Sequence, residues 1–208
     1  MLARMGDTIS AFELIGRPIV DFLLQGVAGH DDPMREVHPW HVLLNVTSQG
    51  APGSLFGPLS EALAEAGDRR LLRDALIAAS GAQAARLWKI RENLVEAQVA
   101  AGGTIAHDVS VPLSRIADFI RRADAALAKA YPGIRPCAFG HVGDGNMHYN
   151  LVRPQHWDGA RYQQERGNIN RIVHDIIAEL GVRSAPSMGS AVHGWPNLNT
   201  TRGRPNSA

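Results

Sequence analysis

The stretch Phe139-Gly-His141-Val-Gly-Asp-Gly-Asn-Met-His148-Tyr-Asn150 decides the fold and the candidate chemistry of this chain. Its centre is Asp144-Gly145, a pair that favours a type I′ hairpin turn because both central positions of that turn need a positive φ. If these two residues form the loop, His141 and His148 stand directly opposite each other on one face, with Cβ atoms about 4.5–5.5 Å apart. The stretch therefore predicts a β-hairpin that carries two facing imidazoles.

Two interpretations of this histidine pair stay open. The two imidazoles can share one divalent metal ion, or they can lie on the surface without a ligand. A catalytic metal site takes roughly three protein ligands and keeps one open position, whereas the spacing supplies two. Asp144 and Asn146 lie in the turn itself and are interpreted as turn formers rather than ligands.

Strands and helices alternate on both sides of the hairpin. Short β-branched or alternating runs predict strands, and apolar residues three and four apart predict helices. The predicted strands are 9–15, 40–46, 107–111, 137–141 and 147–152, and the predicted helices are 17–25, 55–66, 82–100, 112–127 and 162–180, while 72–78 fits either. This order favours an α+β fold, drawn as a ferredoxin-like sandwich with a largely antiparallel sheet and helices on one face.

The composition describes a folded chain without a strong field of either sign. Of 208 residues 45% are apolar, and 21 basic side chains nearly cancel 20 acidic ones, so we expect no nucleic-acid partner. The single cysteine, Cys137, cannot form an internal disulfide. Asp7 and Glu13 interrupt the run that a signal peptide would need, and no segment suits a membrane span. We therefore expect a cytoplasmic protein without membrane insertion.

The last part of the chain, 183–208, differs from the rest. From Ser184 onward it contains no acidic residue and no lysine, and it is rich in Gly, Pro, Asn, Ser and Thr. Such a segment cannot bury enough apolar surface to offset the entropy of ordering. The sequence predicts one folded domain over 8–182 followed by an unstructured tail.

Four segments occur in a recognisable order: Ser10-Ala-Phe-Glu13, Leu87-Trp-Lys-Ile-Arg-Glu92, His107-Asp-Val-Ser-Val-Pro-Leu113 and the histidine hairpin. Together they resemble the C-terminal domain of FAD-linked oxidases, the group of glycolate oxidase subunits, D-lactate dehydrogenases and D-2-hydroxyglutarate dehydrogenases. The resemblance covers 8–182. It implies that the chain is the substrate-binding or cap domain of a FAD-dependent enzyme that oxidises a D-2-hydroxy acid to a 2-oxo acid, with hydride transfer to the flavin.

The resemblance also implies roles for single residues. His141 and His148 match the histidines that bind a divalent metal, usually zinc or manganese. Arg91 matches the arginine that grips the substrate carboxylate, a task suited to a guanidinium, although on a helix it could equally pair with Glu92 or Glu96. Asn146 matches a substrate-site asparagine, and the interpretation as a turn residue remains beside it.

Two parts of the family pattern are absent from the sequence. The domain that holds FAD would precede residue 1, so we expect FAD to be held by a separate domain or subunit. The family's Ser-Ala-Glu-His-Gly-Ile-Gly segment, with a metal-binding glutamate and the proposed base, is expected just after Leu180, where Pro186 and Ser187 stand. No catalytic base is assigned, and the chain alone is expected to be inactive.

A shift of reading frame can account for the second absence. Codons that encode 185–191 can spell Ala-Glu-His-Gly-Ile-Gly one base out of frame, which predicts a frameshift near Val182. The alternative is that Ser190-Ala-Val-His193-Gly194 is a displaced version in frame that lacks the carboxylate. The competing function class is a non-enzymatic α+β module that binds a metal or an anion, or a decayed gene product.

Overall fold

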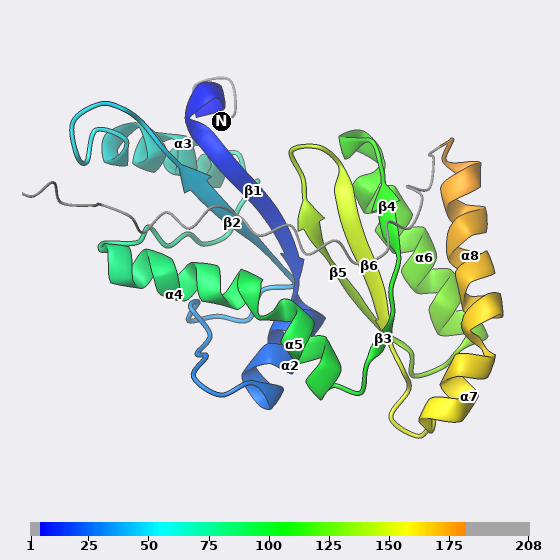
Figure 1. The fold of residues 1–208 in the computed structure, drawn as a ribbon. Helices are drawn as coiled ribbons and strands as arrows, with labels where there is room; N and C mark the ends of the chain where they lie inside the picture. Colours follow the sequence, from blue (N-terminus) through cyan, green and yellow to red (C-terminus); the bar gives the residue numbers. More distant parts are fainter. Residues whose placement is uncertain (1–4, 182–208) are drawn as a thin grey trace, which may run out of the picture.

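A six-stranded antiparallel sheet organises residues 5–181, the part of the chain that the computed structural model describes (Figure 1). Its strand order is β2-β1-β5-β6-β3, and β4 also pairs with β6. The strands are β1 (Ile9–Gly16), β2 (Trp40–Val46), β3 (Thr104–Ile105), β4 (Asp108–Ser110), β5 (Arg135–His141) and β6 (Asn146–Val152). The predicted α+β class and antiparallel sheet are confirmed, whereas the predicted tail lies outside the described residues.

The helices follow the predicted apolar stripes, with two interruptions. They are α2 (Arg17–Gly26), α3 (Phe56–Asp68), α4 (Gly81–Glu92), α5 (Leu94–Ala100), α6 (Ile116–Ala130), α7 (Gly159–Gln164) and α8 (Arg166–Glu179), with 3₁₀ turns η1 (Gly6–Thr8) and η2 (Leu113–Arg115). The helix predicted over 82–100 breaks at Asn93, whose side-chain amide meets the Nε2 of His30 at 2.9 Å. The helix predicted over 162–180 breaks at Glu165, which accepts hydrogen bonds from Tyr131 and Asn168.

Helices cover both faces of the sheet, which corrects the expected arrangement on one face. Ala138 and Tyr149 belong to the core under α6 and α8, whereas Cys137 and Phe139 belong to a second core with residues of α2, α4 and α5. Figure 1 shows α6 and α8 on one side of β5 and β6, and α2 and α5 on the other. An apolar stripe shows which side of a helix is buried but not which sheet face it covers. The continuous buried run at 137–140 is the pattern of a strand that is covered twice.

The hairpin has a longer turn than predicted, and the register changes with it. Val142–Gly145 forms the turn, so His141 pairs with Asn146 and His148 pairs with Phe139. The reason is local: Gly145 has a positive φ of 75° but Asp144 does not, and the Asp144 carboxylate accepts the Asn146 N–H at 2.9 Å. A type I′ turn at Asp144-Gly145 is therefore excluded. His141 and His148 still share a face, but they are diagonal neighbours rather than opposite partners.

Gly145 also shows why the turn admits no larger residue. A Cβ at this position would lie 2.3 Å from the carbonyl oxygen of Val111, which no real contact allows. The Val111 N–H in turn donates to the Gly145 carbonyl at 2.9 Å. The turn is thereby tied to the end of β4, and this contact fixes the end of the hairpin that carries the histidines.

Candidate functional site

Two imidazoles on the sheet face shared with α4 form the centre of the candidate site. The ring centroids of His141 and His148 are 6.3 Å apart. The Nδ1 of His141 is hydrogen-bonded to Oε1 of Glu13, and the Nδ1 of His148 is 2.5 Å from Oδ1 of Asp108. A carboxylate oxygen accepts a hydrogen bond, so these contacts fit a proton on each Nδ1, and the Nε2 of each ring is the nitrogen that faces away from the carboxylate.

The Nε2 atoms are the ones left for a ligand. The side chains of His141 and His148 are 38% and 27% exposed, and neither Nε2 has a hydrogen-bond partner within residues 5–181. A carboxylate behind the imidazole is also the usual arrangement around metal-binding histidines. Carboxylates thus orient both rings, and Nε2 is the remaining nitrogen of each.

Arg91 reaches this pair through a buried glutamate. Its Nε donates to Oε2 of Glu13 at 2.8 Å, and the Glu13 side chain is only 4% exposed. The partner is not the Glu92 or Glu96 considered from the sequence. The structure therefore brings Arg91 from α4 to the histidine strand β5, with Glu13 of β1 between them.

The ring of Phe139 lies close to both Arg91 and His148. The Arg91 guanidinium carbon is 5.2 Å from the Phe139 ring centroid, and the His148 ring is 4.9 Å from it on a tilted plane. Phe139 itself is 3% exposed. Its burial gives Arg91 and His148 a rigid apolar support.

Asn146 is the first residue of β6, directly after the turn, and its interpretation as a substrate-site asparagine stays a prediction. Its backbone N–H closes the turn on Asp144, and it stands directly across the ladder from His141. Paired residues of an antiparallel ladder share a face. Asn146 therefore lies on the same sheet face as His141, and only its backbone N–H takes part in the turn.

Glu13, Asp108 and Phe139 were missed as site residues by reasoning from the sequence. Each stands inside a quoted motif, but its partner comes from another strand or helix. A usable signal existed for Glu13, since a charged residue between Phe12 and Leu14 in an apolar strand must be paired if it is buried. No comparable signal marks Asp108 or Phe139.

The predicted metal site has no more than two imidazoles within the described residues. Among residues 5–181 no group of three or more His, Cys, Asp and Glu side chains is placed to hold an ion. Of the surface hollows, one follows the turn along Ser110, Val111 and Gly145, and another lies beside Arg17 and Trp40. Neither of these two hollows is lined by His141 or His148.

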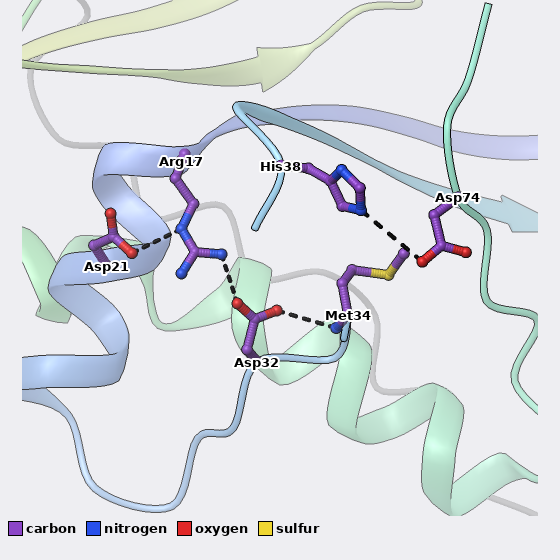
Figure 2. Close-up of polar contacts among 6 residues, drawn as sticks. All are labelled: Arg17, Asp21, Asp32, Met34, His38 and Asp74. Carbon is purple, nitrogen blue, oxygen red and sulfur yellow. Dashed lines mark hydrogen bonds and ion pairs between the residues drawn. The ribbon is translucent and has the colours of Figure 1, made fainter. Parts of the chain in front are cut away.

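A second histidine pair, His38 and His41, lies near the start of β2, and Figure 2 shows His38 with its polar neighbours. The same view shows the guanidinium of Arg17, which contacts Asp21 at 2.7 Å and Asp32 at 2.5 Å, while Asp32 also accepts the Met34 N–H. The Nε2 of His38 is 3.9 Å from Asp74, too far for a hydrogen bond. Within the described part of the chain, this nitrogen and both ring nitrogens of His41 are buried without a hydrogen-bond partner. Burial lowers the pKa of His41.

A comparison of the sequence with known protein families gives a match. The sequence profile of the FAD linked oxidases, C-terminal domain, matches residues 1–185. The chain belongs to this family. Its domain is therefore the one that the four quoted segments, the histidine hairpin among them, indicate.

Several curated relatives of this chain carry the name D-2-hydroxyglutarate dehydrogenase. The chain is similar to D-2-hydroxyglutarate dehydrogenase of Xanthomonas citri pv. viticola, at 35% identity over 149 residues, which is 70% of this chain and 30% of the relative. It is also similar to the mitochondrial enzymes of that name from Bos taurus, at 30% identity over 72% of this chain, and Arabidopsis thaliana, at 27% over 74%. In both of these relatives the match spans 27% of the length. The chain spans about a third of the relatives it matches.

Proposed function

We propose that this domain binds the substrate of a FAD-dependent oxidoreductase that converts a D-2-hydroxy acid to a 2-oxo acid. The observation that carries the proposal is the placement of the Arg91 guanidinium beside two outward-facing imidazoles, with Glu13 between Arg91 and His141. A 2-hydroxy acid presents a carboxylate next to a hydroxyl, so one cation and one hydroxyl-binding group at short range suit it. Family membership and the names of the relatives support the same class.

Each residue has a definite part in the proposed binding. Arg91 holds the substrate carboxylate with the N–H groups that Glu13 does not use, and Asn146 contacts the substrate from across the ladder. The Nε2 atoms of His141 and His148 hold a divalent metal, zinc or manganese. When bound, such an ion polarises the substrate hydroxyl and lowers the cost of negative charge on its oxygen. A third protein ligand would come from outside residues 5–181.

FAD, in this proposal, is held by a separate domain or subunit. The side chains of His141 and His148 are 38% and 27% exposed, so part of each ring is accessible to a covering domain. A flavin domain that covers this face would exclude water and bring the flavin ring to the substrate. We accordingly expect the purified chain to be colourless and inactive by itself.

The location of the protein stays a prediction. Among residues 5–181 no helix has the length and apolar character to cross a bilayer. We keep the cytoplasmic location inferred from the sequence as a proposal, since two of the relatives named above are mitochondrial enzymes.

Calorimetric titration of the full chain tests the function. In the presence of zinc, D-2-hydroxyglutarate or D-lactate should bind more tightly than the L enantiomer and than acetate, and Arg91→Ala should weaken this binding at least about tenfold. Arg86→Ala, on the same helix, is the matched control and should leave the affinity unchanged. Equal binding of acetate and of both enantiomers would instead support a general metal- or anion-binding module.

A further inference from the structure

The carboxylate of Glu13 contacts both arms of the candidate site. Oε1 accepts from the Nδ1 of His141, and Oε2 accepts from the Nε of Arg91 at 2.8 Å. The three residues come from β1, β5 and α4. One side chain thus joins the residue proposed to bind the substrate carboxylate to a residue proposed to bind the metal.

The burial of Glu13 makes this contact more than a surface ion pair. Its side chain is 4% exposed, and a buried carboxylate is costly unless its oxygens are satisfied. Both carboxylate oxygens of Glu13 have a partner, one in His141 and the other in Arg91. Glu13 thereby links these two side chains. Neighbouring β1 residues Ile15 and Leu14 pack into the two cores, so the strand itself is held rigidly.

Asp108 provides an internal comparison. It contacts His148 in the same way, through the ring Nδ1, but its side chain is 51% exposed and this is its only side-chain partner in the described residues. Asp108 therefore orients one imidazole. Glu13 orients one imidazole and one guanidinium.

We propose that Glu13 is a positioning residue that sets the ring orientation of His141 and the guanidinium plane of Arg91 together. It fixes the Nδ1–H tautomer of His141, which leaves Nε2 for the ligand. It also takes up the Nε–H of Arg91, so that the terminal N–H groups point to one anion position over the Phe139 ring. This inference rests on the proposed function for its meaning, but its structural content can be tested without substrate or metal.

The first experiment is NMR of the ¹⁵N-labelled full chain without metal. We expect His141 and His148 both to carry the proton on Nδ1, and the Arg91 Nε–H to exchange slowly with water. Glu13→Gln should change the His141 tautomer signals and speed Arg91 Nε–H exchange, while His148 keeps its signals. Asp108→Asn, the matched acid-to-amide control, should change only His148. Asp118→Asn, at an exposed pair with Arg121, should change none of them.

The second experiment measures zinc binding and chiral preference by calorimetry. Glu13→Gln and Asp108→Asn should each lower zinc affinity about 10–100-fold, the usual effect of removing a carboxylate behind a ligating histidine. At saturating zinc, Glu13→Gln should lose the preference for D-2-hydroxyglutarate over its L enantiomer, and Asp108→Asn should keep it. A purely electrostatic role for Glu13 would instead raise the affinity for every anion alike.

The outcomes separate this inference from the proposed function. If the wild-type chain shows no preference for the D enantiomer, the proposed function fails, and the NMR result still decides the role of Glu13. If Glu13→Gln leaves the His141 tautomer and the Arg91 Nε–H unchanged, the inference is overturned whatever the chain binds. Should Glu13→Gln fail to fold, Arg91→Lys takes its place: the His141 Nδ1–H signal should shift through Glu13 while that of His148 stays, and an unshifted His141 signal overturns the proposal.

Discussion

The molecule contains two histidine pairs with the same separation and opposite surroundings. In His141 and His148, as in His38 and His41, the ring centroids are 6.3 Å apart in an edge-on arrangement. The first pair has a carboxylate on each Nδ1 and leaves its Nε2 atoms toward solvent. In the second pair three of the ring nitrogens are buried without a partner in the described residues.

The comparison teaches that the distance between two imidazoles does not define a ligand site. Carboxylates behind the first pair fix one tautomer in each ring and turn its free nitrogen outward, which preorganises it. Three ring nitrogens of the second pair are buried without a hydrogen-bond partner in the described residues, which costs stability, and burial lowers the pKa of His41. We interpret the first pair as functional and the second as part of the packing around β2.

The largest expected difference between the pairs is in zinc binding. His141→Ala or His148→Ala should lower the zinc affinity of the full chain at least about 100-fold, because each removes one of the two proposed protein ligands. His38→Ala and His41→Ala should leave that affinity within about twofold, on the same scale. Isothermal titration calorimetry of the four variants checks this, and a loss confined to the His38 and His41 variants would reverse the assignment.

The ion-pair cluster of Arg17 with Asp21 and Asp32 should matter for the stability of the fold. Arg17 is 15% exposed and holds Asp21 and Asp32, so Arg17→Ala leaves charged groups unpaired near the start of α2. We expect the free energy of unfolding to fall by about 1.5–3 kcal/mol, the usual value of hydrogen bonds to charged groups. Urea denaturation measures it. Arg121→Ala, at an exposed pair, should cost less than about 1 kcal/mol, and equal losses would show that the Arg17 cluster adds nothing special.

The smallest expected effect is the contribution of His41 to the pH dependence of the free energy of unfolding. Burial lowers the pKa of His41 in the folded chain, so the unfolded chain binds more protons below the ordinary value near 6.5. The contribution of the neutral ring is present above that pH and is lost as the pH falls toward the lowered folded value. His41→Leu should therefore recover about 1 kcal/mol at low pH, measured by urea unfolding at two pH values.

A second buried histidine and a control variant help to interpret the His41→Leu measurement. Burial also lowers the pKa of His107, whose Nδ1 and Nε2 contact Tyr149 and Asn170, so part of the acid sensitivity should persist in His41→Leu. His156→Leu, at an exposed histidine, is the matched control and should not change the slope. An unchanged slope in His41→Leu would mean that the second pair is solvated after all.

Local sequence predicted the elements well where each one depends on its own residues. The strand at 40–46 and the helix at 17–25 agree with β2 and α2 to within a residue, because Pro18 and Pro39 mark their boundaries. Contacts with distant residues account for the failures. His30 meets Asn93 where the predicted long helix breaks, and the cover on the second sheet face comes from α2, α4 and α5.

In the candidate site, too, the sequence predicted what depends on local residues and missed what depends on distant contacts. His141 and His148 could be picked from one motif because both lie on one hairpin. Glu13 and Asp108 could not be given roles, since their contacts depend on the β1–β5 and β4–β6 pairings, which span 128 and 40 residues of sequence. The turn register was also missed, since the Asp144 side chain competes for the Asn146 N–H and so changes the turn type.

One diffraction measurement tests the central claim most directly. Crystals of the full chain soaked in zinc should give an anomalous peak at about 2.0–2.1 Å from the Nε2 atoms of both His141 and His148, with Glu13 and Asp108 still bonded to the Nδ1 atoms. A peak at His38 and His41, or zinc bound through the Nδ1 atoms with the carboxylates displaced, would contradict the account.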